Sequence, residues 1–562
     1  MRLLPAVAGT DVAVILCSDV FDRPTVPFSF QRAASLLRAQ APAAQVIAVR
    51  ELCARLSELP DAFSSLRVPR VVVGCARGKE REQRIRRTLR DKGAHPSGLQ
   101  VVDLSSTSGG DPVLAGHQLV ARLRAAVARA SSGDLNAPIS ERAPGMGASA
   151  FSRRDLFRFG CSAPHPVAAW AAGSCTGQGA ARPCVASCPR GALSCQGSRV
   201  TVDSGRCTGC GACIRTCGTG ALTLNGACLA ELEASGNCLA DEARGLGFGV
   251  MIVCSQAANV VRLGSGWLPL EVPSLEIVTA GWALQYVAAG VPVALMGCAE
   301  AACSYRARKV AGFASSLLGQ VAPEHRRMVV LRYDLGPARA VAADRGACTD
   351  VPPSAFRLHF REPEATVLAA QHLVPEDQQL VPLPGSWRLE SPSAPLGEID
   401  IDQARCSGCG CCVQACSSGA LSMAAGQWRG LAFDFDPRAC SACEACVRSC
   451  PEGAVSLTRA VSSSILSGGR RVIAGAAAKD QCPLCGRATG ASPVSQFVAS
   501  RLAGSHPEVA ARLRAQGGCV YCVGTRVASS GLVGAGLASA AQGGTQSGRR
   551  RDAGHASPSD PL

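Results

Sequence analysis

The sequence has few aromatic residues, few histidines and no long apolar run. Phe, Trp and Tyr together make up 4% of its 562 residues, and its 8 histidines are scattered without a metal-binding spacing. A nucleic-acid surface usually combines basic residues with aromatic ones, so nucleic acid is not an expected partner. No apolar stretch reaches the roughly 18 residues that a membrane-spanning helix needs. We therefore expect a chain without a membrane span.

Signals for export and for several kinds of catalysis are also missing. The N-terminal residues run into a predicted strand without the charged and apolar regions of a secretory signal, which favours a cytoplasmic location. No Gly-x-Gly-x-x-Gly follows a predicted strand, as a dinucleotide site requires. The sequence also shows no nucleophile with a nearby base and no molybdenum-type ligand set. It thus favours a non-catalytic subunit over an enzyme.

Cysteine, by contrast, is abundant. The chain contains 31 cysteines, a number that would indicate disulfides in a small secreted protein. In a chain of this length, cysteines gathered in triplets indicate metal ligands in a reducing compartment instead. Clusters bound by thiolates carry negative charge, so they balance part of the formal net charge of +15.

Two copies of one cysteine pattern lie between Cys406 and Pro451. Each copy reads C-x2-C-x2-C-x3-C, and the second ends in Cys-Pro. This run is typical of bacterial iron–sulfur proteins, in which the fourth cysteine of each copy binds the other cluster. The pattern therefore predicts two [4Fe-4S] clusters and leaves Cys411 outside both. Their ligands are Cys406, Cys409, Cys412 and Cys450 for one, and Cys440, Cys443, Cys446 and Cys416 for the other.

Residues 399–460 resemble the two-cluster bacterial ferredoxins. The resemblance rests on the cysteine spacing and on the turns that follow each fourth cysteine, Gly419-Ala420-Leu421 and Gly453-Ala454-Val455. It implies a ferredoxin-like fold that carries single electrons. Two zinc sites are the alternative, but zinc ligands usually come in cysteine pairs around longer loops.

A second module of this kind is predicted at residues 161–226. Its later half, Cys207-x2-Cys210-x2-Cys213-x3-Cys217, has the complete pattern. Cys188, which is followed by Pro, completes a [4Fe-4S] ligand set with Cys207, Cys210 and Cys213.

The earlier half of that module is incomplete. It resembles the ferredoxin-like subunits of molybdenum oxidoreductases, except that Ala172 stands where those have a first cysteine. The loss of one ligand resembles the seven-iron ferredoxins and implies a [3Fe-4S] or [4Fe-4S] cluster. Its predicted ligands are Cys175, Cys184 and Cys217, with Cys161 as a candidate for the missing one. An empty half is the alternative.

The first 130 residues alternate between strand and helix patterns. Strands are predicted at 11–16 and 71–73, and helices at 30–40, 51–59 and 81–91, which together indicate a parallel sheet. The segment from Arg70 to Glu80 resembles the N-terminal region of the A-type proteins of heterodisulfide reductase. Cys17 and Cys75 follow the predicted strands, at the edge where open α/β sheets bind ligands. Packed core cysteines are the alternative.

Residues 227–345 also have α/β character. Strands are predicted at 250–254 and 291–296 and a helix at 275–289, and the second strand leads into Gly297-Cys298-x4-Cys303. The stretch resembles the small iron–sulfur (delta) subunit of methyl-viologen-reducing hydrogenase, which implies a [2Fe-2S] cluster on Cys254, Cys298 and Cys303. Ser255 and Ser274 stand where that family has cysteines, so the fourth ligand is not identified. A docking platform without a cluster is the alternative.

Two C-x2-C pairs near the C-terminus predict a further site with four thiolates. The pairs are Cys482 with Cys485 and Cys519 with Cys522. This spacing is typical of structural zinc. A rubredoxin-like iron and the absence of any metal are the alternatives.

The sequence therefore predicts a multidomain α/β plus α+β protein, in which two ferredoxin-like modules alternate with Rossmann-like α/β domains and a four-cysteine knuckle follows. We expect an electron relay between oxidoreductase partners, similar to hydrogenase and heterodisulfide reductase accessory subunits. An assembly or redox-sensing factor with labile clusters is the alternative. The predicted boundaries are 1–130, linker 131–160, 161–226, 227–345, connecting arm 346–398, 399–460, knuckle region 461–528 and disordered tail 529–562.

Overall fold

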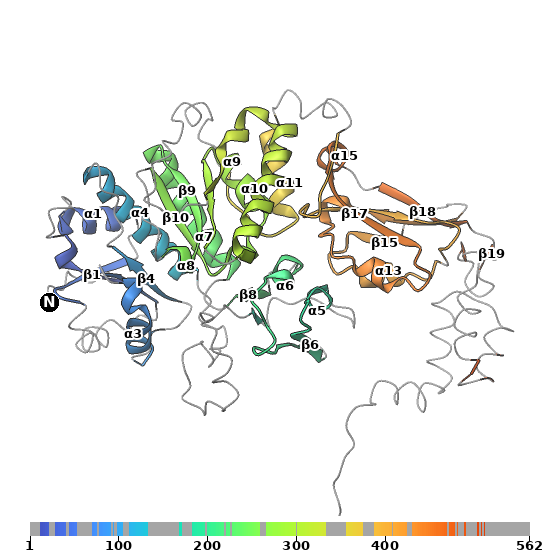
Figure 1. Cartoon of the computed structure of the whole chain (residues 1–562), viewed down its shortest axis with the longest axis horizontal. Coiled ribbons are helices and arrows are strands. Elements are labelled where there is room, and N and C mark those ends of the chain that lie inside the picture. The colour runs from blue at the N-terminus through green and yellow to red at the C-terminus, as the bar shows by residue number, and fades with distance from the viewer. Residues whose placement is uncertain are drawn as a thin grey trace, which may run out of the picture. The chain divides into compact units, whose positions relative to one another are not determined.

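The chain folds into a mixture of helices and strands with several sheets (Figure 1). Cys161, Cys175, the four knuckle cysteines and the segments 133–160 and 529–562 lie outside the described residues. The computed structural model describes residues 12–21, 29–40, 44–52, 70–75, 78–91, 94, 98–104, 112–132, 168–170, 183–196, 199–217, 221–224, 228–258, 266–298, 301–332, 356–374, 387–406, 408–423, 430–468, 471–477, 480–481, 488–489, 503–504, 507 and 511.

The chain divides into two compact units. The first comprises Met1–Asp400, Cys411–Ser422 and Asp434–Ile473, and the second comprises Ile401–Gly410, Met423–Phe433 and Ala474–Leu562. Among the described helices, none combines the length and the apolar character that crossing a bilayer requires.

A parallel four-stranded sheet lies near the N-terminus, with strand order β2-β1-β3-β4. Its central strands are buried along almost their whole length, as expected of parallel strands covered on both faces. The helix predicted at 30–40 is confirmed, and the one predicted at 81–91 begins three residues earlier. The elements are β1 (Val12–Cys17), η1 (Ser18–Val20), α1 (Phe30–Gln40), β2 (Ala44–Val49), β3 (Arg70–Cys75), α3 (Gly78–Arg90), β4 (Leu99–Asp103) and α4 (Pro112–Ser131).

A second parallel sheet has the order β10-β9-β11-β12. The helix predicted at 275–289 is instead a short 3-10 turn followed by a helix, because Val278 and Thr279 between them have extended backbones. The elements are α7 (Leu229–Leu246), β9 (Gly249–Cys254), α8 (Ser255–Ala258), β10 (Trp267–Val272), η5 (Leu275–Ile277), α9 (Ala280–Ala288), β11 (Val293–Met296), α10 (Ala301–Val321), η6 (Pro323–Met328) and β12 (Val329–Arg332).

The segment predicted as an irregular arm contains a helix, α11 (Glu364–Leu373), that packs on α9. The Trp282 ring stacks on Phe360 with centroids 4.2 Å apart, and its Nε1 donates a 2.8 Å hydrogen bond to the Phe360 carbonyl. The Gln285 amide donates to the Ala365 carbonyl at 2.7 Å. The segment therefore completes the core of the second sheet.

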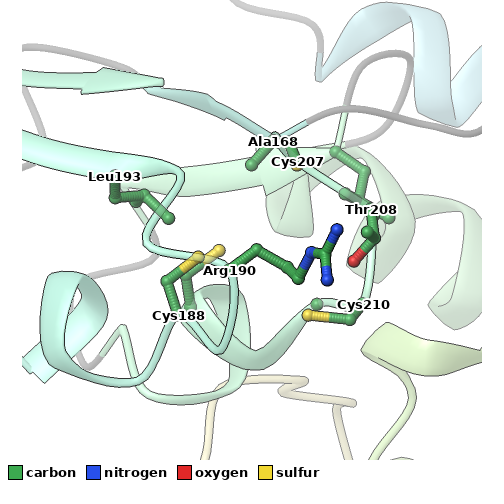
Figure 2. Close-up of a pocket in the computed structure, with 11 residues that line it drawn as sticks. Ala168, Cys188, Arg190, Leu193, Cys207, Thr208 and Cys210 are labelled. Carbon is green, nitrogen blue, oxygen red and sulfur yellow. The ribbon is translucent and has the colours of Figure 1, made fainter. Parts of the chain in front are cut away.

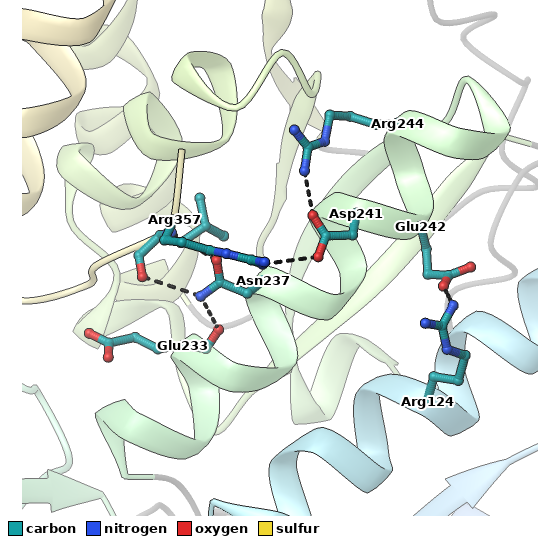
Figure 3. A network of polar contacts seen from close by, with 8 residues as sticks. Arg124, Glu233, Asn237, Asp241, Glu242, Arg244 and Arg357 are labelled. Carbon is teal, nitrogen blue, oxygen red and sulfur yellow. Dashed lines mark hydrogen bonds and ion pairs between the residues drawn. The ribbon is translucent and has the colours of Figure 1, made fainter. Parts of the chain in front are cut away.

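Polar side chains fix α7 to its neighbours (Figure 3). Asn237 donates to the Leu358 carbonyl at 3.3 Å and accepts from the Leu358 amide at 2.9 Å. Glu242 pairs with Arg124 of α4. These contacts join α7 to both the α4 helix and the start of the segment that carries α11.

The cysteine-rich segments have only short elements. In the first, β5 pairs with β8 and β6 with β7, both antiparallel, and in the second β13 pairs antiparallel with β17. The elements are β5 (Ala168–Trp170), α5 (Pro183–Ala186), β6 (Leu193–Gln196), β7 (Arg199–Val202), α6 (Ala212–Arg215), β8 (Leu222–Leu224), β13 (Arg388–Glu390), β14 (Gly397–Ile401), α13 (Cys411–Ala415), β15 (Leu421–Met423), β16 (Gly430–Phe435), η7 (Pro437–Ala439), α14 (Ala445–Ser449), β17 (Val455–Ser462), α15 (Ser463–Ser467), β18 (Arg471–Ala477), β19 (Asp480–Gln481) and β20 (Ala488–Thr489).

Candidate iron–sulfur sites

Four cysteines that the sequence assigns to one cluster line a single pocket (Figure 2). They are Cys188, Cys207, Cys210 and Cys213. Cys207 and Cys213 are buried and the other two are half-buried. Figure 2 also shows the side chain of Arg190 extending between Cys188 and Cys210, a cation beside the thiols that the cysteine pattern does not reveal. The pocket fits a group that needs four thiolate ligands.

The thiols of this pocket influence one another's acidity. Burial, together with the neighbouring thiols of Cys210, Cys207 and Cys188, raises the pKa of Cys213 to about 12. Closely spaced thiolates destabilise one another unless a cation shares them. Metal binding to such a set therefore has to release the thiol protons.

The three complete cysteine triplets share one backbone conformation. The residues on either side of the second cysteine have positive φ: 68° and 63° at Gly209 and Gly211, and 69° and 73° at Gly408 and Gly410. In the third triplet this conformation is adopted by Ala442 (50°) and Glu444 (58°), which carry side chains. Positive φ is unfavourable for such residues, so the surrounding structure must hold this loop in place.

Arginines support two of these loops. Arg215 Nη1 donates to the Cys210 carbonyl at 2.9 Å, and Arg448 Nη2 donates to the Cys443 carbonyl at 2.7 Å. Each arginine stands five residues after the cysteine that it contacts. Sequence reasoning missed these residues, although their repeated spacing was a usable signal.

The fourth cysteines of two modules receive a backbone hydrogen bond on sulfur. The Ala192 amide donates to Cys188 Sγ at 3.2 Å, and the Ala454 amide donates to Cys450 Sγ at 3.3 Å. The tight turn after each cysteine points this amide back at the sulfur. Hydrogen bonds to the sulfurs are among the factors that set cluster potentials.

Cys416 is arranged differently. Its Sγ lies 3.6 Å from the Ser418 hydroxyl, and the Ala420 amide donates to that hydroxyl at 3.4 Å. The Ser418 side chain thus stands between Cys416 Sγ and the Ala420 amide. In the other two turns the corresponding amide contacts the cysteine sulfur directly.

One contact in residues 399–460 agrees with the predicted exchange of fourth ligands, which stays a prediction. Burial raises the pKa of Cys440 to about 12, and the thiols of Cys446, Cys443 and Cys416 add to the effect. Cys416 therefore lies near the second triplet, as the sequence predicts. The other set, Cys406 and Cys409 with Cys412 and Cys450, is divided between the two compact units and stays a prediction.

The incomplete half of residues 161–226 is only partly described. Cys184 and Cys217 are half-buried, and Cys184 is among the thiols that raise the pKa of Cys213. Since Cys161 and Cys175 are outside the described residues, a cluster in this half stays a prediction.

Three buried thiols meet in the second α/β domain. The Sγ atoms of Cys254, Cys298 and Cys303 all lie within 4.8 Å of one another. Cys254 ends β9, Cys298 follows the adjacent parallel strand β11, and Cys303 lies in the first turn of α10. Parallel neighbours end at the same edge of a sheet, which brings the three together. We call these residues the three-thiol site.

Hydrogen bonding inside the three-thiol site shifts the pKa values of two of its cysteines in opposite directions. A hydrogen bond from the Cys303 thiol lowers the pKa of Cys254, and the same bond raises the pKa of Cys303. The Ala257 amide also donates to Cys254 Sγ at 3.3 Å.

A fourth ligand for the three-thiol site is not found among the residues that the structure describes. Ser255 donates to the Pro273 carbonyl at 3.3 Å, and Ser274 accepts from the Glu276 amide at 3.2 Å. The two serines that replace expected cysteines therefore serve the local backbone. The [2Fe-2S] cluster that the resemblance implies on these three cysteines stays a prediction.

A short bridge connects the pocket of Figure 2 with the three-thiol site. Arg215, already bonded to the Cys210 carbonyl, also donates to the Glu276 carbonyl of η5. The adjacent Leu275 makes a backbone hydrogen bond to the Cys303 thiol. The η5 turn thus contacts both sites.

Two segments match known domain families. Residues 405–454 match the 4Fe-4S dicluster domain, and residues 200–223 match the 4Fe-4S binding domain. No curated protein matches the chain. The first match contains all eight cysteines of the two predicted sets, and the second contains the complete triplet of the first module. The chain thus contains two 4Fe-4S domains of the ferredoxin type.

Proposed function

We propose that the chain relays single electrons between partner oxidoreductases, with the clusters of its two ferredoxin-type domains and the three-thiol site as the carriers. Iron–sulfur clusters of this type supply one-electron chemistry when bound. Residues 227–345 resemble a hydrogenase delta subunit, and residues 70–80 resemble the A-type proteins of heterodisulfide reductase. Components of those enzymes are therefore the expected donor and acceptor.

The contact made by η5 is the observation that carries this proposal. Arg215 joins the cluster loop at Cys210 to Glu276, and the neighbouring Leu275 joins to Cys303. A continuous path of covalent and hydrogen bonds therefore runs from one thiol set to the other. The half-buried guanidinium of Arg215 also pairs with the Glu276 carboxylate, 3.9 Å away, which holds the loop against the turn.

The second candidate is an assembly or redox-sensing factor. It is favoured by the three-thiol site, which has no fourth protein ligand among the described residues and could release its metal easily. The two functions differ in what happens to the clusters when they are oxidised. Relay centres cycle reversibly at fixed potentials, whereas sensing or donated clusters are lost.

Redox titration of anaerobically purified protein, followed by electron paramagnetic resonance, tests the relay. The three complete ligand sets predict about 12 iron atoms per chain and repeated cycling without loss. Cys298→Ser should remove only the redox transition and the paramagnetic resonance signal of the three-thiol site. Loss of iron on oxidation, or its transfer to an added apo-acceptor, would favour the second candidate. Fewer than about 8 iron atoms after reconstitution would overturn both.

Ser418 is predicted to tune one potential. Ser418→Ala removes the hydroxyl near Cys416 Sγ, so the reduced, more negative cluster loses a stabilising donor. Because Ser418 is exposed, we expect a small effect of about 0.5 kcal/mol, or about 20 mV towards lower potential. Ser422→Ala is the control, since that hydroxyl contacts the Asp434 carbonyl instead of sulfur. Equal potentials in the two variants would contradict the prediction.

A further inference from the structure

The two α/β domains have the same plan. In each sheet all strands are parallel, and the first strand in the chain lies between the second and the third, with the fourth outside the third. In each domain the first strand ends in a buried cysteine: Cys17 for β1 and Cys254 for β9.

The sequence repeats at both cysteine positions. In each domain the cysteine that ends the first strand, Cys17 or Cys254, is followed by Ser. Gly-Cys-Ala occurs at the end of the third strand, at Cys75 and at Cys298. The next helix begins three residues after that cysteine in both domains, at Gly78 and at Ala301.

The glycine of each Gly-Cys pair has a steric reason to be there. A Cβ on Gly74 would lie 2.7 Å from Leu16 Cδ2, and one on Gly297 would lie 2.9 Å from Ser304 Oγ. Each glycine therefore stands at a crowded position, although different elements crowd the two. Agreement in topology and motif indicates that the first domain is a second copy of the domain that holds the three-thiol site.

The two copies differ in the number of thiols. Cys303 stands five residues after Cys298, whereas Glu80 stands five residues after Cys75. The first copy therefore keeps two of the three cysteines. Two thiols do not complete a tetrahedral metal site, but they are sufficient for a disulfide.

The geometry of Cys17 and Cys75 suits a disulfide. They end adjacent parallel strands whose register pairs Leu16 with Gly74, so the two cysteines come next in register. Neighbouring strands lie about 4.8 Å apart, within the range of about 4.4 to 6.8 Å between the Cα atoms of a disulfide. The two thiols already share a hydrogen bond.

The two thiols are also unequal. The hydrogen bond from Cys75 lowers the pKa of Cys17 to about 6, against the opposing effect of burial. Cys17 is 4% exposed and Cys75 is 0% exposed. The hydrogen bond from Cys75 and the slightly greater exposure of Cys17 favour Cys17 as the attacking cysteine.

We propose that Cys17 and Cys75 form a redox-active dithiol that reduces a disulfide substrate. The Cys17 thiolate attacks one sulfur of the substrate, the substrate S–S bond breaks, and one thiolate leaves and takes up a proton. Cys75 then loses its proton and attacks Cys17 Sγ, which forms the internal disulfide and releases the second substrate thiol. Two cysteines are oxidised and one substrate disulfide is reduced. The step does not depend on the electron relay.

The test uses the reduced full-length protein under anaerobic conditions with two probes: glutathione disulfide as a small substrate and insulin as a protein disulfide. Thiols are then alkylated and the peptides are analysed by mass spectrometry. A linked Cys17–Cys75 peptide pair that dithiothreitol reverses is the expected result. Reaction with glutathione disulfide alone assigns a small substrate, and reaction with insulin alone assigns a protein substrate.

Two isosteric variants test the order of attack. Cys75→Ser should stop at a mixed disulfide on Cys17, and Cys17→Ser should leave Cys75 unmodified. Cys195→Ser, which changes a half-buried thiol of β6, should behave as the native protein at Cys17 and Cys75. The proposal is overturned if neither probe yields the linked pair, or if Cys75 is modified in Cys17→Ser.

Discussion

Replacing Cys416 with Ala is expected to remove the cluster of the triplet that follows it in the sequence, Cys440, Cys443 and Cys446. The cluster of the three cysteines before Cys416 is expected to remain. The reason is that Cys416 lies near Cys440 and Cys446, where its charge adds to the effect of burial on their pKa values, as a ligand of the second predicted set would. Iron content should fall by about four atoms per chain, and electron paramagnetic resonance should show one [4Fe-4S] spin fewer.

Double variants identify which cluster is lost. Cys416→Ala combined with Cys440→Ala should lose no more iron than either change alone, because both remove the same cluster. Cys416→Ala combined with Cys409→Ala should lose about eight iron atoms, because these residues belong to different sets. Cys411→Ala should keep the full content, since Cys411 lies outside both sets. Each run of four cysteines would hold its own cluster if the variant with Cys440→Ala lost about eight iron atoms and the variant with Cys409→Ala lost about four.

Replacing Cys213 with Ala should unfold residues 183–224 while the neighbouring α/β domain stays folded. The two helices of this segment, α5 and α6, have four residues each, so their own packing cannot replace a lost metal group. Amide hydrogen exchange should show a loss of protection of about 100-fold or more in residues 193–202. Residues 249–254 of β9, which are buried throughout, should keep their protection from exchange.

The matched control for this change is Cys195→Ala. Cys195 lies in β6 of the same segment but does not line the pocket of Figure 2. The Cys195→Ala variant should keep both its iron content and the exchange protection of residues 193–202. If Cys213→Ala lost its iron and residues 193–202 stayed protected, the segment would be stable by itself, and the cluster would serve electron transfer without supporting the fold.

The prediction of the α/β domains shows where sequence reasoning fails. Periodicity located β9 and α1 because apolar runs and helical spacing are local properties of the chain. The same reasoning joined η5 and α9 into one helix and took the α11 segment for an irregular arm. The first error arose because the extended backbones of Val278 and Thr279 separate η5 from α9. The second arose because the formation of a short helix is decided by the surface that buries it, and for α11 that surface is α9.

The sequence by itself determined that the chain contains two 4Fe-4S domains of the ferredoxin type, because three cysteines at intervals of three residues can bind one group from a single loop. A resemblance had already grouped Cys254, Cys298 and Cys303, but only the tertiary structure placed their sulfurs within 4.8 Å of one another and Cys17 beside Cys75. These residues are far apart in the chain, and each pairing depends on which strands become neighbours in a parallel sheet. Strand order is set by the packing of the whole domain, so residue spacing does not encode it locally.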